Sequence, residues 1–285
     1  MSGTFLPVNG WASTWSLSTT NQELAEMQGV GINWVILQNS VDLEAQEAWY
    51  PESWYPQGTN VVGNVAQAAI SHHMGLILGL AEPSYSEWAA NEGNASWLNG
   101  QLQLNEAIAD ALYAYVGTDF EGWYIPEEID DYAVNYHSAL IASYIGQLSA
   151  YLHTHDGDKG VLASSFYQNF LTPAAYAAGL RSVMASVDAV TVEDGASEGS
   201  GRTPAQIASI FQPLSSSFAS GPQLWDDPDM YGLNGGPLPP AGLVSDLQAV
   251  CGLASFVTGF SFPSQLDPLN GETAQYNAYQ SYEAG

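Results

Sequence analysis

The sequence predicts an α/β fold and, within that class, a single (β/α)8 TIM barrel: one catalytic domain over residues 1–285. Three observations indicate this architecture. The chain has 285 residues, near the size of about 250 that is typical of such barrels. Short apolar runs alternate with helical stretches, as in repeated βα units. The segments after the apolar runs are longer than those before them, as expected when one end of a barrel carries the functional loops.

Eight apolar runs are the expected barrel strands, at residues 3–8, 33–38, 75–81, 122–125, 160–165, 189–193, 222–225 and 256–262. Helices are expected between them at residues 21–28, 60–72, 105–116, 131–153, 173–184, 203–216 and 243–253. Thr172-Pro173 and Thr203-Pro204 each place a capping side chain before a proline, which supports two of these helix starts. The longest loops, residues 39–59, 82–104 and 226–242, all follow strands and should meet at the C-terminal end of the barrel.

The charge balance excludes several classes of partner. Three Lys and Arg stand against 30 Asp and Glu, a formal net charge of −27, which repels nucleic acids and anionic lipids. No apolar run reaches the length of about 18 residues that a membrane span needs, so we expect no membrane insertion. We expect a monomer whose partner is a polysaccharide or oligosaccharide substrate.

Only 12% of residues are charged, so neutral polar side chains must supply much of the surface polarity, and these keep it as the pH falls. This favours an acidic extracellular medium over a salt-loaded cytoplasm. The lone Cys251 allows no intrachain disulfide and does not settle the compartment. The first residues show no signal-peptide pattern, but the scarcity of lysine favours a secreted or periplasmic protein from which the export signal has been removed.

The end of the fourth strand carries the strongest catalytic candidate. If Tyr124 points into the barrel, strand alternation turns Glu128 inward and Glu127 outward. Acidic groups this close raise one another's pKa, which suits a proton donor. The alternative is that these acids form the first turn of the next helix, which explains Asp130 and Asp131 better than catalysis does.

Further acids end the sixth and seventh strands. Asp194 precedes a glycine turn, and Asp227 and Asp229 lie beside aromatic residues. A glycosidase needs one carboxylic acid to protonate the leaving oxygen and a second carboxylate to attack the sugar or to activate water. The alternative is that these aspartates bond their own backbone in turns.

Aromatic rings near the same loops can stack on sugars while polar groups bond their hydroxyls. The side chains expected to bind substrate in this way are Asn9, Trp11, Gln38, Glu82, Trp123, Tyr124, Tyr167, Glu193, Trp225 and Tyr231. Loop packing explains roughly half of the rings equally well.

We predict no metal and no cofactor. The run from His153 to Asp158 has metal-ligating residue types, but it precedes the fifth strand and belongs at the opposite end of the barrel, where a solvated turn is the simpler interpretation. The chain has no Gly-rich phosphate loop, no G-x-S-x-G elbow and no H-E-x-x-H pair, so it lacks the usual signatures of phosphoryl transfer, serine hydrolysis and zinc peptidases.

Residues 122–130, GWYIPEEID, resemble a motif of a large bacterial family long labelled only as a domain of unknown function and grouped with TIM-barrel glycoside hydrolases. That motif is Gly-aromatic-Tyr-Ile-Pro-x-Glu-Ile-Asp, and the match places the shared acid at Glu128. The family's sixth-strand motif Gln-Asp-Gly-Val-Gly is similar to residues 193–197, with departures at Glu193, Ala196 and Ser197. Its seventh-strand Trp, acid and aromatic residue are similar to Trp225, Asp229 and Tyr231, where Asp229 departs from the pattern.

The resemblance implies a glycoside-hydrolase-like architecture without naming a substrate. We therefore expect an endo-acting glycosidase on an extracellular polysaccharide, with Glu128 as general acid/base. The second carboxylate stays open among Asp227, Asp229 and Asp194. The alternatives are a non-catalytic carbohydrate-binding TIM barrel and a metal-dependent deacetylase or lyase.

Overall fold

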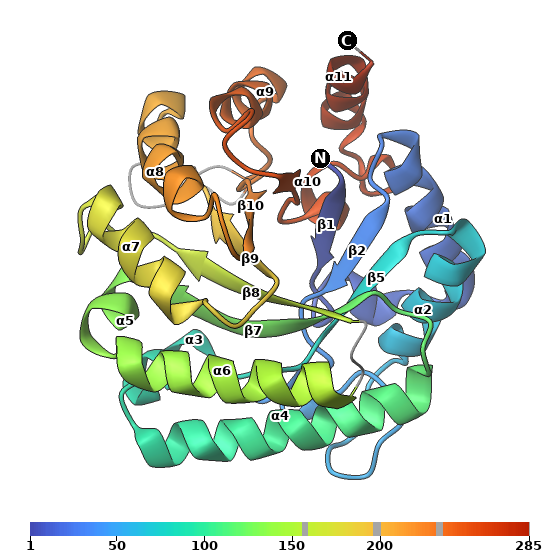
Figure 1. Cartoon of the computed structure of the whole chain (residues 1–285). Helices are drawn as coiled ribbons and strands as arrows, with labels where there is room; N and C mark the ends of the chain where they lie inside the picture. Colours follow the sequence, from blue (N-terminus) through green and yellow to red (C-terminus); the bar gives the residue numbers. More distant parts are fainter. Residues whose placement is uncertain (156–158, 196–200, 232–235, 285) are drawn as a thin grey trace.

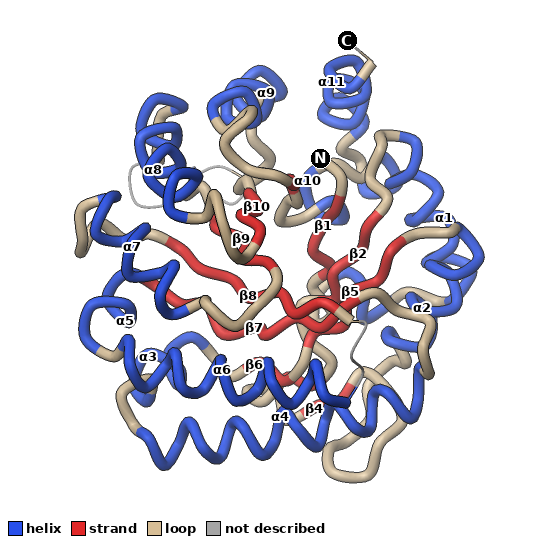
Figure 2. Tube along the Cα trace, in the orientation of Figure 1, coloured by secondary structure: helices blue, strands red, loops and turns tan. Residues whose placement is uncertain are grey.

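Eight parallel strands form the barrel wall in a computed structural model that describes residues 1–155, 159–195, 201–231 and 236–284. Their order is β1 (Gly3–Leu6), β2 (Trp34–Leu37), β5 (Gly75–Gly79), β7 (Gly122–Asp130), β8 (Gly160–Phe166), β9 (Ala189–Glu193), β10 (Gln223–Asp227) and β11 (Phe256–Val257). Backbone hydrogen bonds from Ser2 to Val257 (2.8 Å) and from Phe5 to Gly259 (3.1 Å) join β11 to β1. The predicted (β/α)8 barrel is confirmed, and all eight expected strands are present (Figures 1 and 2).

Helices surround the strands (Figure 2). They are α1 (Leu17–Gly29), α2 (Val61–His72), α3 (Tyr85–Asn91), α4 (Ala95–Val116), α5 (Asp131–Tyr136), α6 (Ser138–His155), α7 (Pro173–Val183), α8 (Pro204–Ser217), α9 (Pro240–Ala249), α10 (Phe262–Gln265) and α11 (Thr273–Glu283), with short 3-10 turns η1 (Trp11–Thr14) and η2 (Pro268–Asn270). No helix among the described residues is both long and apolar enough to cross a membrane.

The two largest differences from the predicted helices concern α4 and the pair α5 and α6. The helix expected from residue 105 begins at Ala95, because the Asn94 side chain accepts hydrogen bonds from the backbone of Ser96 and Trp97 and caps it there. The helix expected over residues 131–153 is divided into α5 and α6, since the chain leaves helical geometry at His137.

The barrel interior and the space beneath the helices hold two separate apolar cores. Phe5, Ile36, Ile77, Tyr124, Leu162 and Ala189 fill the interior, with Trp34, Trp225 and Phe260 packed against them. The residues that alternate with them, such as Trp123 and Val190, belong to the outer core. This alternation tells which side chains at the strand ends point into the barrel mouth.

A small sheet covers part of the mouth. It contains β3 (Val41–Asp42), β4 (Glu47–Ala48) and β6 (Ala81–Glu82), in the order β4-β3-β6. Asp42 pairs with Glu82 across the parallel β3–β6 ladder. This pairing brings the loop that follows β2 and the loop that follows β5 together beside the end of β5.

The three basic side chains bind backbone carbonyl groups and lie over aromatic rings. Lys159 donates to the carbonyls of Thr118 and Phe120, Arg181 to that of Ser220, and Arg202 to those of Asp194 and Tyr167. Their cationic groups lie 5.0 to 5.9 Å from the ring centroids of Phe120, Phe218 and Tyr167. Among the described residues, ion pairs with carboxylates involve only the N-terminal amine, His137 and His153.

Candidate active site

The two glutamates at the end of β7 differ in exposure and in their contacts. Glu128 is partly exposed, and both glutamates line a cavity of about 140 Å³ to which Glu82 also contributes. Glu127 is 1% exposed and lies against the surrounding helices. The register of β7 against β8 shifts between residues 125 and 129, the segment that contains Pro126 and both glutamates.

Glu127 joins β7 to α4 and α6. Its Oε1 accepts a hydrogen bond from the Tyr144 hydroxyl at 2.5 Å and one from Asn105 Nδ2 at 3.4 Å. Burial raises the pKa of the Glu127 carboxyl to about 7, against the lowering effect of these donors. Glu127 is therefore well placed to position the strand end.

Glu82 stands next to Glu128 in the cavity and can hold a proton at neutral pH. It accepts hydrogen bonds from Gln38 Nε2 at 2.7 Å and from Asn39 Nδ2 at 2.5 Å. Burial, followed by the charge of Glu128, raises its pKa to about 8 in spite of these donors. The sequence predicted Glu82 only as a sugar-binding side chain.

Asp227 reaches the mouth from the end of β10. It lies two residues after the interior Trp225, so strand alternation points it inward, and it pairs in register with Glu193 of β9. Asp227 is 4% exposed and accepts a hydrogen bond from Thr258 Oγ1 at 3.0 Å. Burial, then the charge of Asp229, and also that of Glu128, raise its pKa well above the usual range.

The Tyr124 hydroxyl, in the barrel interior, lies near three of these carboxyl groups. This hydroxyl donates to Ser164 Oγ at 2.8 Å. Burial raises its pKa, and the charges of Glu128, Glu82 and Asp227 raise it further. Charges from the ends of β7, β6 and β10 thus act on the same hydroxyl, so we infer that the three carboxyl groups surround one opening.

The remaining aspartates form a cluster behind this opening. The backbone N–H of Asp229 donates to Asp194 Oδ1 at 3.1 Å, and both are almost fully buried. Asp226 is completely buried, and neither of its carboxyl oxygens has a hydrogen-bond partner among the described residues. Burial and the charges of Asp194, Asp227, Asp229 and Asp246 raise the pKa of Asp226 well above the usual range.

A second cavity of about 170 Å³ adjoins the first. Asn9, Gln38, Asp42, Glu82 and Tyr85 line it, and Asn9 Nδ2 donates to Asp42 Oδ2 at 3.2 Å. Because Glu82 and Tyr85 line both cavities, the two form one cleft across the mouth. Of the other expected sugar-binding residues, Glu193 and Tyr231 are partly exposed, and Trp11 is an exposed ring on η1.

Three expected sugar-binding rings lie away from the cleft. Trp123 is fully buried in the outer core, 4.7 Å from the Phe120 ring. Tyr167 belongs to the same core, against Tyr176. Trp225 lines a cavity at the N-terminal end of the barrel together with Trp34. These three rings therefore lie outside the candidate site.

Sequence reasoning missed Asp42, Ser164 and Thr258. Ser164 follows the interior Leu162 by two residues, so continued counting along β8 would have found it. Asp42 and Thr258 lie in short irregular segments whose positions depend on the tertiary fold.

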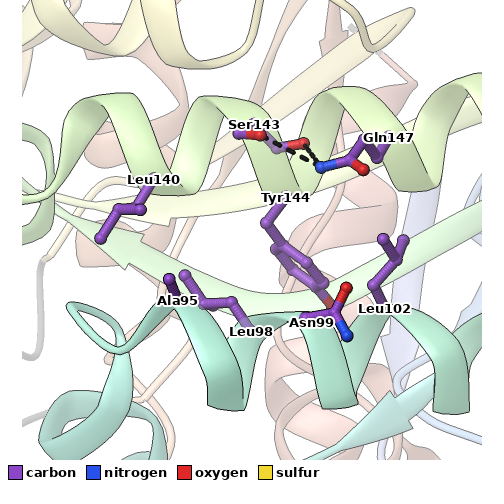
Figure 3. Close-up of a pocket in the computed structure, with 8 residues that line it drawn as sticks. All are labelled: Ala95, Leu98, Asn99, Leu102, Leu140, Ser143, Tyr144 and Gln147. Atoms are coloured by element: carbon purple, nitrogen blue, oxygen red, sulfur yellow. Dashed lines mark hydrogen bonds between the residues drawn. The ribbon is translucent and has the colours of Figure 1, made fainter.

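The pocket between α4 and α6 is lined by no carboxylate among the described residues. In this pocket of about 220 Å³, Tyr144 reaches down between Leu98 and Leu102, and the lining side chains are apolar or neutral polar (Figure 3). Among the described residues, no three His, Cys, Asp or Glu side chains are arranged to hold a metal ion. His153 instead contacts Asp188 at 2.7 Å, while Asp156 and Asp158 lie outside the described residues, as do Ala196 and Ser197.

The barrel and its cleft define a protein with a glycoside-hydrolase-like fold. Residues 1–267 match the family described as "Domain of unknown function (DUF4434)", and the chain belongs to this family. The resemblance seen in the sequence is thereby confirmed. No curated protein gave a significant sequence match.

Solved structures of sugar-cleaving enzymes share the fold at low identity. A putative α-L-fucosidase from Bacteroides thetaiotaomicron superimposes with a TM-score of 0.83 at 16% identity, covering 100% of this chain and 95% of its own. An endo-β-1,4-mannanase from Thermotoga petrophila gives 0.69 at 12% identity, with 99% and 76% covered. The endo-1,4-β-mannanase from Rhizomucor miehei gives 0.63 at 14% identity, with 99% and 94% covered.

Proposed function

We propose that this protein is a glycoside hydrolase that cleaves a polysaccharide, with Glu128 as the general acid/base and Asp227 as the second carboxylate. One observation carries the proposal. The two carboxyl groups come from the C-terminal ends of different strands and enter the same mouth, close enough that Glu128 raises the pKa of Asp227. The C-terminal end of a TIM barrel is where its active sites are built, and the fold neighbours with sugar-cleaving names support the same reaction class.

The two carboxyl groups differ in a way that suits different roles. Glu128 is partly exposed in the cavity, so it can exchange its proton with the leaving oxygen and with water. Asp227 is buried and fixed by Thr258, which suits attack on the anomeric carbon. For this attack the Asp227 carboxyl must be ionised, and the positive charge that develops on the sugar in the transition state would stabilise the ionised form.

Asp227 is preferred over the other candidates because of where the side chains point. The backbone N–H of Asp229 donates to Asp194, and the charges of both aspartates raise the pKa of the buried Asp226 as well as that of Asp227. Glu82 completes the site from β6. Its raised pKa leaves a neutral carboxyl beside Glu128, and its O–H can donate to a sugar hydroxyl. Because a polysaccharide does not cross membranes, this role also calls for a secreted or periplasmic enzyme.

Reducing-end release from a panel of polysaccharides tests the proposal. We expect Glu128→Gln and Asp227→Asn each to lose roughly 10²- to 10⁴-fold in turnover. The matched controls are their outward-facing neighbours, Glu127→Gln and Asp226→Asn, which should keep most of it. Azide should restore turnover to Asp227→Gly if Asp227 is the nucleophile, because azide can occupy the vacated space and attack the sugar.

Two results would contradict this assignment. Full activity of Asp227→Asn with loss in Asp229→Asn or Asp194→Asn would move the second carboxylate into the rear cluster. Binding of polysaccharide without any release by the wild-type protein would instead support a non-catalytic carbohydrate-binding barrel.

A further inference from the structure

Three aromatic rings form an exposed cluster beside the end of β7, which we call the aromatic shelf. Tyr132 and Tyr136 lie on α5, and Phe170 lies in the connection between β8 and α7. The elements α5 and α7 are at the left of Figure 1. The Tyr132 ring centroid is 4.7 Å from that of Tyr136 and 5.3 Å from that of Phe170. Tyr132, Tyr136 and Phe170 are 38%, 63% and 58% exposed. Single exposed rings are common on soluble proteins, but a contiguous group is typical of a binding surface.

A buried carboxylate fixes the loop that carries Phe170. Asp131 is fully buried, and its two oxygens accept hydrogen bonds from the backbone of Gln168 at 2.9 Å and of Leu171 at 2.8 Å. Between them Asn169 has a φ of 69°, in the left-handed region that Asn tolerates better than most residues. The Phe170 ring is thus held outward by a bonded backbone, with the orientation that a binding surface requires.

A hydrogen bond connects the shelf to the cleft. Gln168 Nε2, from the same loop, donates to the Tyr85 hydroxyl at 3.2 Å. Tyr85 lines both cavities of the cleft, including the one that contains Glu128. An aromatic and polar path therefore runs from Glu128 over Tyr85 to Phe170 and Tyr136.

We propose that the aromatic shelf binds a further stretch of an uncharged polysaccharide whose cleaved bond lies at Glu128. This inference rests on the proposed function and specifies its substrate as a neutral polymer, which suits endo-action. Flat rings bearing hydroxyl groups fit the apolar faces and hydroxyls of pyranose units. The excess of 30 acidic over three basic residues repels an anionic glycan or an anionic membrane.

Affinity gel electrophoresis of Glu128→Gln, which should bind without turnover, tests the inference. The gels contain glucomannan, β-1,4-galactan or xylan, with polygalacturonate as the anionic comparison. We expect at least one neutral polymer to retard the protein, and Tyr136→Ala with Phe170→Ala, added together, to weaken that binding about tenfold or more. The matched control is Ile70→Ala, which removes a side chain of 50% exposure beside the N-terminal ends of β2 and β5 and should change nothing.

The outcomes separate this inference from the proposed function. The shelf would not be a glycan site if the double variant were retarded as strongly as its parent. The same conclusion would follow if polygalacturonate alone, or no polymer, retarded the protein. It would also follow if the parent were a dimer and the double variant a monomer, since the shelf would then be a subunit interface. Failure of the wild-type protein to release reducing ends, with retardation still dependent on the shelf, would overturn the proposed hydrolysis and leave the shelf intact. An unchanged melting temperature of the double variant excludes unfolding as the cause of weaker binding.

Discussion

Replacing Glu127 by Gln should remove a pH-dependent loss of stability. Burial of this carboxyl between β7 and the helices raises its pKa from 4.5 to about 7. Between these two values the folded protein holds a proton that the unfolded chain releases. The stabilisation is therefore complete below pH 4.5 and is lost as the pH rises through 7.

The magnitude follows from the width of that interval. Each pH unit of difference corresponds to about 1.4 kcal/mol, so the free energy of unfolding falls by up to about 3 kcal/mol between pH 4.5 and pH 8 on account of Glu127 alone. Gln has nearly the shape of protonated Glu, and its Oε1 can accept the bonds from Tyr144 and Asn105, but it does not titrate. We expect the variant to match the wild type at pH 4.5 and to exceed its stability at pH 8.

Urea unfolding followed by tryptophan fluorescence at pH 4.5, 6 and 8 measures this difference. The control is Glu121→Gln, at an exposed position, which should follow the wild-type pH dependence. If the gap between Glu127→Gln and the wild type is the same at pH 4.5 and at pH 8, then Glu127 is ionised throughout and the argument from burial is wrong.

Three further predictions concern stability. Glu23→Gln should raise the thermal midpoint at pH 9 and leave it unchanged at pH 4. Burial and then the charge of Asp267 raise the pKa of Glu23 to about 8, so the stabilisation of the folded protein by the protonated form is lost as the pH rises through that value. A lower midpoint of the variant at pH 9 would contradict this. Asp131→Ala should lower the free energy of unfolding by about 2 kcal/mol in urea titrations, since it leaves the backbone N–H groups of Gln168 and Leu171 without their acceptor, and an unchanged midpoint would show that water replaces the carboxylate. The wild-type protein should melt at a higher temperature at pH 5 than at pH 8, without molar salt and with no effect of a chelator; a need for molar salt at neutral pH would indicate a halophilic protein instead.

The barrel could be predicted because its signals are local. Each strand is an apolar run of a few residues, and the helix caps at Thr172 and Thr203 can be recognised from the proline that follows each threonine. The prediction was wrong about where some strands end and about how deep their side chains lie in the barrel. The seventh strand was expected to end at Trp225, but it continues to Asp227, so Trp225 lies one layer deeper than expected and contacts Phe256 in place of a ligand.

Part of the candidate site could not be predicted because it depends on burial, which a sequence does not contain. Alternation was enough to distinguish Glu127 from Glu128. It could not show that the pKa of Glu82 is raised beside Glu128, since that depends first on how deeply Glu82 is buried. The preference for Asp227 likewise depends on its distance from acids on other strands.

The contacts of the three basic side chains do not depend on the ionisation of any carboxylate, so they are kept at acidic pH. A lysine or arginine that holds a loop through a glutamate loses its acceptor when that glutamate is protonated. Lys159, Arg181 and Arg202 instead bind peptide oxygens and lie over rings, and neither kind of partner gains a proton as the medium acidifies. The hydrogen bonds and cation–π contacts that hold the chain before β7, before β10 and after β8 therefore persist across the whole pH range in which the acidic residues titrate.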